Sequence, residues 1–216
     1  AHDFNNILAV IVLYAHMAQR AVDAAHPVQR WMSIITDQSS QATDLIQQML
    51  DFSRRGDVRR EPIDLLALLD QQVRLLQRTL PETIAVTLDH VPGATYTVLG
   101  DTTRIQQVVT NLAVNARDAM PDGGRLRISL TPLTVQPDAV PPLPQMAPGE
   151  WVCRSVADTG TGMSREVREH LFEPVFTTKE PGKGTGLGLA QVYGIVAQHD
   201  GCIDVKTRVG RGTVFT

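Results

Sequence analysis

Apolar residues in the first quarter of the chain recur three and four positions apart. The first run comprises Phe4, Ile7, Ile11, Tyr14, Ala18 and Ala21. After a break near "DAAHP", a second run that includes one glutamine comprises Trp31, Ile35, Gln38, Ala42, Leu45, Met49 and Phe52. This spacing places each run along one side of a helix, and Pro27 suits the first position of the second helix. The pattern therefore predicts a helical hairpin.

The hairpin, within residues 1–56, exposes more apolar surface than two helices can cover. Pairing two hairpins into a four-helix bundle is the simplest arrangement that buries this surface. We therefore expect a homodimer formed through the hairpin.

After "FSRRGDVRREP" the pattern changes to a mixture of helix and strand periods. We expect helices over 65–80, 102–120 and 187–199, and strands at 62–64, 84–88, "GGRLRISL", "EWVCRSVADTG", "CIDVKT" and "GTVFT". The stretch "TPLTVQPDAVPPLPQMAPG" is interpreted as a variable hairpin loop, with proline recognition as the less favoured alternative. Residues 57–216 are therefore expected to form an α+β domain.

The composition is that of a soluble globular protein. The 216 residues are 43% hydrophobic and carry a net charge of −3, so no positive field favours nucleic acid or an acidic membrane surface. No apolar run approaches the roughly 20 residues of a membrane span. The two cysteines, Cys153 and Cys202, lack metal-ligand spacing and fit a reducing compartment. We therefore expect a cytoplasmic chain with no membrane segment and no nucleic-acid partner.

Two glycine-rich segments, "VADTGTGM" and "GKGTGLGLA", are candidates for an anion site. Their glycines are Gly160 and Gly162 in the first segment, after Asp158, and Gly184, Gly186 and Gly188 in the second. Glycines let backbone N–H groups approach a phosphate, and a helix amino terminus favours negative charge. Neither segment fits a Walker or dinucleotide-binding motif, and glycine clusters more often only form turns.

The predicted helix "TTRIQQVVTNLAVNARDAM" carries polar residues on a second face. Asn111, Asn115 and Asp118 follow the spacing i, i+4, i+7 and lie apart from the core stripe. A solvated face would explain them, but asparagine is a mediocre helix former, so two in mid-helix call for another reason. A carboxamide oxygen suits Mg²⁺, which shares its shell with substrate phosphates.

Four motifs in fixed order, "NLAVNARDAM", "DTGTGM", "LFEPVFTTK" and "GKGTGLGLA", make the second half resemble the ATP-binding domain of sensor histidine kinases. The stretch "AHDFNN" and the hairpin after it resemble their dimerisation and phosphoacceptor domain. The resemblance implies a two-domain α+β fold. Its parts are a dimerising phosphotransfer hairpin over 1–56, which forms a four-helix bundle, and an α/β sandwich of the Bergerat type over 57–216. ATP and Mg²⁺ are the implied cofactors.

The resemblance also implies a role for each polar residue of the helix and of the second glycine segment. Asn115 corresponds to the Mg²⁺ ligand, and Asn111 assists at the phosphates. The other implied nucleotide-binding residues in this part of the site are Asp118, Thr178, Gly184, Thr185, Gly186, Leu187, Gly188 and Leu189.

Asp158 corresponds to the residue that reads adenine, its carboxylate accepting a hydrogen bond from the exocyclic amine. Gly160 and Gly162 would let the base come close. Thr213, in "GRGT", would support the same edge of the base.

Residues 163–183 correspond to the family's mobile lid over the triphosphate, with Lys179 and Lys183 as implied charge partners. The aromatic residues of "LFEPVFTTK" match the family, except that Val175 stands where relatives often have another aromatic side chain. We interpret this difference as a packing variation without consequence for the chemistry.

His2 is expected to face away from the hairpin seam and to accept the phosphoryl group. A neutral imidazole nitrogen can attack the γ-phosphorus, and Asp3 can keep the other ring nitrogen protonated and oriented. The family then passes the group to an aspartate of a response-regulator receiver domain. In the family the position of Asn6 orients water for dephosphorylation, so phosphatase activity is a secondary hypothesis.

Two alternative functions are an ATPase of the wider gyrase, Hsp90, histidine kinase and mismatch-repair (GHKL) superfamily and a catalytically silent dimerisation scaffold. The ATPase relatives activate water with a glutamate one turn before the metal-binding asparagine, and here that position is Asn111. A site without this base favours transfer to a protein nucleophile over hydrolysis. The intact glycine segments argue against the scaffold. The sequence therefore predicts an ATP-dependent protein-histidine kinase.

Overall fold

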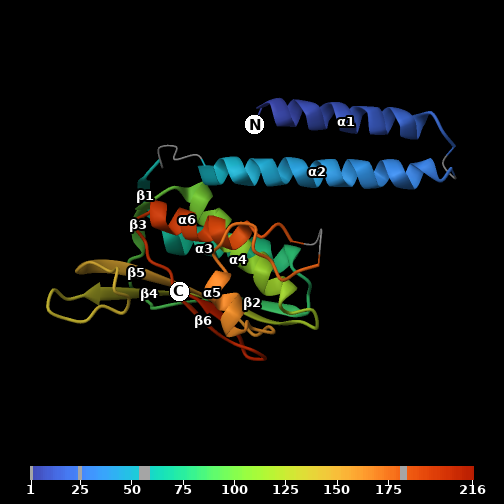
Figure 1. Ribbon diagram of the computed structural model, residues 1–216. Coiled ribbons are helices and arrows are strands. Elements are labelled where there is room, and N and C mark those ends of the chain that lie inside the picture. Colours follow the sequence, from blue (N-terminus) through green and yellow to red (C-terminus); the bar gives the residue numbers. More distant parts are fainter. Residues whose placement is uncertain (1, 24–25, 54–58, 181–183) are drawn as a thin grey trace. The chain divides into compact units, whose positions relative to one another are not determined.

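The computed structural model describes residues 2–23, 26–53, 59–180 and 184–216 (Figure 1). The chain divides into two compact units, residues 1–56 and residues 57–216. The first unit is a pair of helices, and the second combines helices with β-sheet.

Helix α1 (His2–Arg20) and helix α2 (Val28–Ser53) form the first unit. They lie side by side as a hairpin, as the apolar spacing predicts (Figure 1). Near the turn, Nε2 of Gln29 donates to the backbone oxygens of Gln19 at 2.7 Å and of Val22 at 3.2 Å. This glutamine joins the start of α2 to the end of α1.

Large apolar side chains remain on the surface of this single hairpin. Ala15 and Ser39 are buried, but many larger residues of α1 and α2 are not. The exposed set is Ile7, Val10, Ile11, Leu13, Tyr14, Met17, Trp31, Ile34 and Ile35. A surface of this kind suits further helices packed against it. The four-helix bundle stays a prediction, and this surface supports it.

A five-stranded sheet is the frame of the second unit. In order across the sheet, its strands are β2 (Ile84–His90), β4 (Gly124–Val135), β5 (Gly149–Asp158), β7 (Gly212–Phe215) and β6 (Val205–Arg208). β2 and β4 are parallel, and all other neighbours are antiparallel. A separate antiparallel pair consists of β1 (Glu61–Asp64) and β3 (Thr97–Gly100).

Three helices cover one face of the sheet (Figure 1). They are α3 (Leu65–Thr79), α4 (Thr102–Asp118) and α6 (Gly188–Gln198). Every second residue of β4 points toward them, and Leu126, Ile128 and Leu130 are at most 1% exposed. These side chains share one core with Leu69 of α3 and Val192 of α6. The expected α/β sandwich is confirmed.

Aspartates begin two of these helices. Oδ1 of Asp64 accepts from the backbone N–H groups of Leu66 and Ala67, and Oδ1 of Asp101 accepts from that of Arg104. These bonds satisfy N–H groups that have no partner within the helix, and so they define where α3 and α4 begin.

The structure differs from the sequence predictions in its shortest elements. The sequence pattern predicts neither β3 nor the short helix α5 (Arg165–His170). β4 continues through Val135, so the first part of the proline-rich stretch pairs with β5 and only its remainder is loop. β6 begins at Val205, three residues after the start of the predicted strand. The apolar pattern therefore marks neither β3 and α5 nor the exact ends of β4 and β6.

Both cysteines, Cys153 and Cys202, are free thiols. Burial raises the pKa of the Cys153 thiol. Within the described ranges, none of the helices combines the length and apolar character that crossing a bilayer would require.

Arg154 is a charged residue on the covered face of the sheet. Arg154 pairs with Leu130 in the ladder between β4 and β5, so both side chains project from the face of the sheet that the helices cover. Among the described residues, no ion pair or hydrogen bond to its guanidinium is found. Burial lowers the pKa of this guanidinium to about 10. Keeping the charge there costs folding free energy.

We predict that Arg154→Met raises the free energy of unfolding by about 1–3 kcal/mol, because methionine keeps the apolar stem and removes a desolvated charge. Urea unfolding of the full chain, followed by circular dichroism, measures the change. Arg125→Met, at an exposed position on neighbouring β4, is the control and should stay within about 0.5 kcal/mol of the wild type. A less stable Arg154→Met protein would contradict this description of the half-buried charge.

Candidate functional site

Helix α4 presents Asn111 to the first turn of α6. Nδ2 of Asn111 donates to the backbone oxygen of Gly188 at 3.2 Å and to Oε1 of Gln191 at 3.1 Å. These two bonds join the predicted asparagine face to the second glycine segment.

The opposite end of α6 is also attached to α4. The backbone N–H of Asp101 donates to Nε2 of His199 at 2.9 Å, and Nη1 of Arg104 donates to Oε1 of Gln198 at 2.5 Å. Nδ1 of His199 lies 2.8 Å from the backbone oxygen of Ile195 and therefore carries the ring proton. His199 is therefore a packing residue, and α6 is held against α4 at both ends.

Asn115 lies next to Gly188, one turn beyond Asn111. A Cβ atom added at Gly188 would sit 3.9 Å from Nδ2 of Asn115 and 3.9 Å from Cγ of Asn111. In the part of the chain that the structure describes, no hydrogen bond to the Asn115 side chain is found. Its half-buried carboxamide is therefore available to a ligand beside the start of α6.

Asp158 ends β5 next to the last strand pair. Its Oδ1 accepts from the backbone N–H of Gly160 at 2.8 Å and of Thr213 at 3.3 Å. Burial raises the pKa of Asp158, and these two hydrogen bonds only partly oppose the rise. Among the described residues nothing donates to Oδ2, so this oxygen can accept from a ligand. Thr213 is buried, and its hydroxyl lies 3.1 Å from that of Thr207.

Gly160 and Gly162 are needed for close backbone contacts around Asp158. A Cβ atom at Gly160 would lie 2.6 Å from the backbone oxygen of Ala119, at the end of α4. Gly162 has a φ of +64°, and a Cβ atom there would lie 2.2 Å from the backbone oxygen of Arg208. From the sequence, these glycines are expected to let a base come close. In the structure, the close backbone contacts already require glycine at both positions when no ligand is bound.

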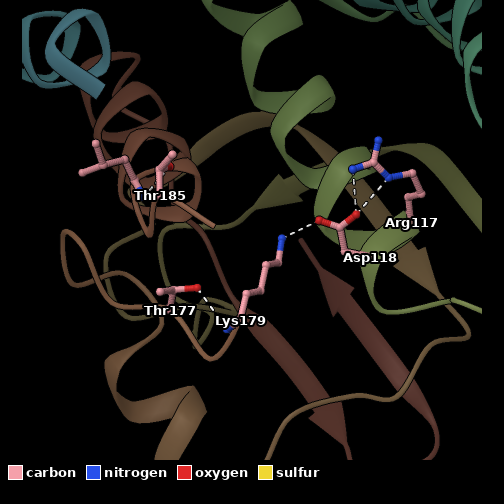
Figure 2. A network of polar contacts seen from close by, with 6 residues as sticks. Arg117, Asp118, Thr177, Lys179 and Thr185 are labelled. Carbon is pink, nitrogen blue, oxygen red and sulfur yellow. Dashed lines mark hydrogen bonds and ion pairs between the residues drawn. The ribbon is translucent and has the colours of Figure 1, made fainter. Parts of the chain in front are cut away.

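Asp118 and Lys179, both predicted to contact nucleotide, pair with each other (Figure 2). Nζ of Lys179 lies 2.5 Å from Oδ2 of Asp118, while Nε and Nη2 of Arg117 donate to Oδ1. Burial raises the pKa of Asp118, but the hydrogen bonds from Lys179 and Arg117 outweigh burial and hold this pKa below its usual value. The segment around Lys179 is thereby tied to the end of α4.

The predicted lid, residues 163–183, contains ordered structure in its described part. Ser164 caps α5, Leu171 is buried in the core, and the rings of Phe172 and Tyr193 lie 5.2 Å apart. Val175 has an exposed side chain and a φ of 69°, and its N–H donates to the backbone oxygen of Gly186 at 3.1 Å. The side chain at this position is therefore outside the core, and the interpretation of Val175 as a packing variation without consequence for the chemistry stays a prediction.

The residues around the second glycine segment divide into exposed and packing positions. Thr178 is exposed, and the hydroxyl of Thr185 accepts from the N–H of Leu187 at 3.3 Å. Leu187 is buried and Leu189 packs against the core, so only their backbone can serve a ligand. A Cβ atom at Gly184 would lie 2.8 Å from the hydroxyl of Thr177.

Part of the predicted site falls outside the description. His2 and Asp3 belong to the first turn of α1, but their side chains are not described. Lys183 lies outside the described residues altogether. Asn6 is exposed on α1. The roles implied for these four residues stay predictions.

Sequence reasoning missed Gln191 and Arg117, which bond to predicted site residues. The signal for Gln191 was a single glutamine on the buried side of the apolar segment "GLAQVYGIVA". Arg117 carries no comparable signal, because an arginine in the last turn of a helix is ordinary.

Two protein families match the chain. Residues 1–57 match the His Kinase A (phospho-acceptor) domain, and residues 100–216 match the family described as histidine kinase-, DNA gyrase B-, and HSP90-like ATPase. The sensor kinase CckA of Brucella abortus (strain 2308) is 40% identical over 215 residues. That match covers 100% of this chain and 23% of CckA, so the chain spans less than a quarter of this relative.

Solved structures share the fold of both units. Full-length ShkA in complex with AMPPNP matches 99% of this chain and 43% of its own, with a TM-score of 0.73 and 23% identity. Histidine kinase ThkA in complex with the response regulator TrrA matches 100% of this chain and 57% of its own, with a TM-score of 0.65 and 23% identity. The two matched families and the similarity to CckA show that the chain belongs to the sensor histidine kinases, with a phosphoacceptor domain followed by an ATPase-type domain.

Proposed function

We propose that this chain is the kinase core of a two-component signalling protein. Residues 57–216 bind ATP with Mg²⁺, and residues 1–56 dimerise and carry the histidine that accepts the γ-phosphoryl group. The observation that carries the proposal is the bond from Asn111 to Gly188, which brings the asparagine face of α4 to the amino terminus of α6.

The donor set beside Gly188 fits Mg²⁺. Asn115 offers a carboxamide oxygen, and Asn111 uses its amide nitrogen on α6, which leaves its oxygen for a ligand. Mg²⁺ prefers hard oxygen ligands and keeps part of its shell for substrate phosphates. When bound, it would offset the negative charge of the β- and γ-phosphates. Asn115 is the proposed ligand, and Asn111 assists.

The adenine reader in this proposal is Asp158. Oδ1 is occupied by two backbone N–H groups, which orients the carboxylate and leaves Oδ2 to accept from the exocyclic amine. Gly160 and Gly162 let the loop after Asp158 pack closely against the backbone of Ala119 and Arg208. The buried Thr213 would support the same edge of the adenine base as Asp158.

The triphosphate in this proposal lies at the start of α6. Backbone N–H groups at Gly186, Leu187 and Gly188 meet the favourable end of the helix dipole. Lys179 would exchange Asp118 for a phosphate oxygen when ATP binds, since a lysine can change partners at little conformational cost. The remaining residues of the proposed nucleotide-binding site are Thr178, Lys183, Gly184, Thr185 and Leu189.

The proposed reaction is an in-line transfer to His2. The neutral ring nitrogen attacks the γ-phosphorus, the bond to the β–γ bridging oxygen breaks, and ADP leaves. Asp3 would hold the proton of the other ring nitrogen, and Asn6 would orient water in a secondary phosphatase reaction. The phosphoryl group then passes to an aspartate of a receiver domain, as the complex of the relative ThkA with a response regulator suggests.

Two further proposals concern assembly and location. The exposed apolar side chains of α1 and α2 support a homodimer through the hairpin. The two free cysteines support a reducing compartment, and we propose the cytoplasm.

The test of the proposed function is incubation of the full chain with γ-labelled ATP and Mg²⁺. We expect acid-labile, alkali-stable label on the protein, because phosphohistidine has this stability pattern, and we expect none on His2→Gln. His16→Gln, at another exposed histidine of α1, is the matched control and should label like the wild type. Equal labelling of His2→Gln would refute the assignment, and a wild type that binds no nucleotide would support the silent scaffold.

Asp158→Asn should weaken ATP binding by about 10- to 100-fold, because an amide N–H₂ in place of Oδ2 cannot accept from the adenine amine. Fluorescence anisotropy with a labelled ATP analogue measures the affinity. The control is Asp122→Asn, an exposed aspartate in a turn, with an expected change below about twofold. Unchanged affinity in Asp158→Asn would show that adenine binds elsewhere.

The same carboxyl group predicts the pH dependence of binding. The amine stabilises the ionised carboxylate, so ATP affinity should fall as pH decreases through the pKa of Asp158 in the free protein. Burial raises that pKa, so the fall should begin at a higher pH than for an ordinary aspartate, whose pKa is about 3.9. Asp158→Asn should lack this acid limb, and an identical limb in both proteins would contradict the assignment.

A further inference from the structure

Gln191 is a polar residue on the buried side of helix α6. It is 6% exposed, and its buried neighbours on α6 are Ala190, Val192 and Ile195. A buried amide is costly unless it is hydrogen-bonded, so its partners indicate what it does.

The partners of Gln191 lie on α4. Its Oε1 accepts from Nδ2 of Asn111 at 3.1 Å and from Nε2 of Gln107 at 3.4 Å. Nδ2 of Asn111 also donates to the backbone oxygen of Gly188 at 3.2 Å. A primary amide nitrogen has two hydrogens, so α6 takes both hydrogens of Asn111.

The orientation of the Asn111 amide follows from the Gly188 contact. A backbone carbonyl can only accept, so the group facing it must be the N–H₂ of Asn111. The reversed amide would place Oδ1 of Asn111 against two oxygens, those of Gly188 and Gln191. Asn111 therefore cannot donate to a phosphate oxygen while it is held by α6, and it offers a ligand only its Oδ1.

We propose that Gln191 is a positioning residue for phosphoryl transfer, which holds the Asn111 amide so that Oδ1 is the atom that it would offer to Mg²⁺. This inference rests on the proposed function. Without the Gln191 acceptor, Asn111 keeps only the Gly188 bond, so one of its two amide hydrogens loses its partner and the amide is held less firmly. Asp158 and the adenine pocket do not depend on this contact. The loss should therefore appear in the rate of transfer and hardly in the affinity for ATP.

The test compares Gln191→Met with Gln72→Met in the full chain. Methionine matches the length of glutamine and removes the acceptor. Gln72 is the matched control, because it is also a buried glutamine, at 7% exposed, and bonds to a different side of α4, at the backbone oxygen of Gln106. Gln191→Met should slow phosphorylation of His2 by about 10- to 100-fold and change the KM for ATP by less than about threefold. Gln72→Met should stay within about twofold.

A double mutant separates positioning from general loosening of the helices. If Gln191 acts through Asn111, adding Gln191→Met to Asn111→Ala should slow the reaction no further. The inference is overturned if Gln191→Met behaves like Gln72→Met, or if it slows Asn111→Ala as strongly as it slows the wild type.

A measurement on the wild type needs neither a stable variant nor activity. The side-chain N–H₂ signals of Asn111 in an ¹H–¹⁵N spectrum, identified by their loss in Asn111→Asp, should exchange slowly with solvent, because both hydrogens are bonded. Exchange at the rate of a free amide overturns the inference even if Gln191→Met does not fold. A wild type that binds no ATP overturns the proposed function and this inference together. A wild type that is phosphorylated but insensitive to Gln191→Met overturns this inference alone.

Discussion

The attachment of α6 to α4 is the contact on which the candidate site depends. At one end the backbone of Asp101 bonds to His199, and at the other end Asn111 bonds to Gly188. Both asparagines of α4 lie beside the first turn of α6, since a Cβ atom at Gly188 would be 3.9 Å from an atom of each. An anion at that turn and a cation at those asparagines would therefore be neighbours, which phosphoryl transfer from a metal nucleotide requires.

The same helix also positions the carboxylate at the end of β5. The loop after Asp158 packs on the last turn of α4 so closely that Gly160 leaves no room for a Cβ atom beside Ala119. The N–H of Thr161 donates to that same backbone oxygen at 2.9 Å. α4 thus connects the three parts of the proposed site: the asparagine face, the start of α6 and the Asp158 carboxylate. Because these contacts are between backbone and short side chains, the arrangement is largely preformed.

Much of this fold follows from periodicity along the sequence. The helices and most strands have a period long enough to recognise, and "LRISL" alternates as a half-buried strand should. The pattern did not predict β3, because this strand has only four residues and its partner β1 lies more than 30 positions earlier in the chain. In the site, residue types and spacing pointed to Asn111, Asn115 and Asp158. They could not reveal that Lys179 pairs with Asp118 or that Gln191 holds Asn111, because both contacts join segments more than 60 positions apart. The side chains of His2 and Asp3 stay at the level of sequence prediction.

We propose that this site transfers the γ-phosphoryl group to protein and does not hydrolyse ATP, because Asn111 stands where related ATPases have a water-activating glutamate. The most direct measurement is a single-turnover reaction of the full chain with limiting γ-labelled ATP and Mg²⁺. The label in protein and in free phosphate is followed over time. We expect label to appear first on the protein, and free phosphate to form only as this protein-bound label decays. Free phosphate released from the earliest times, without labelled protein before it, would show that the site hydrolyses ATP directly.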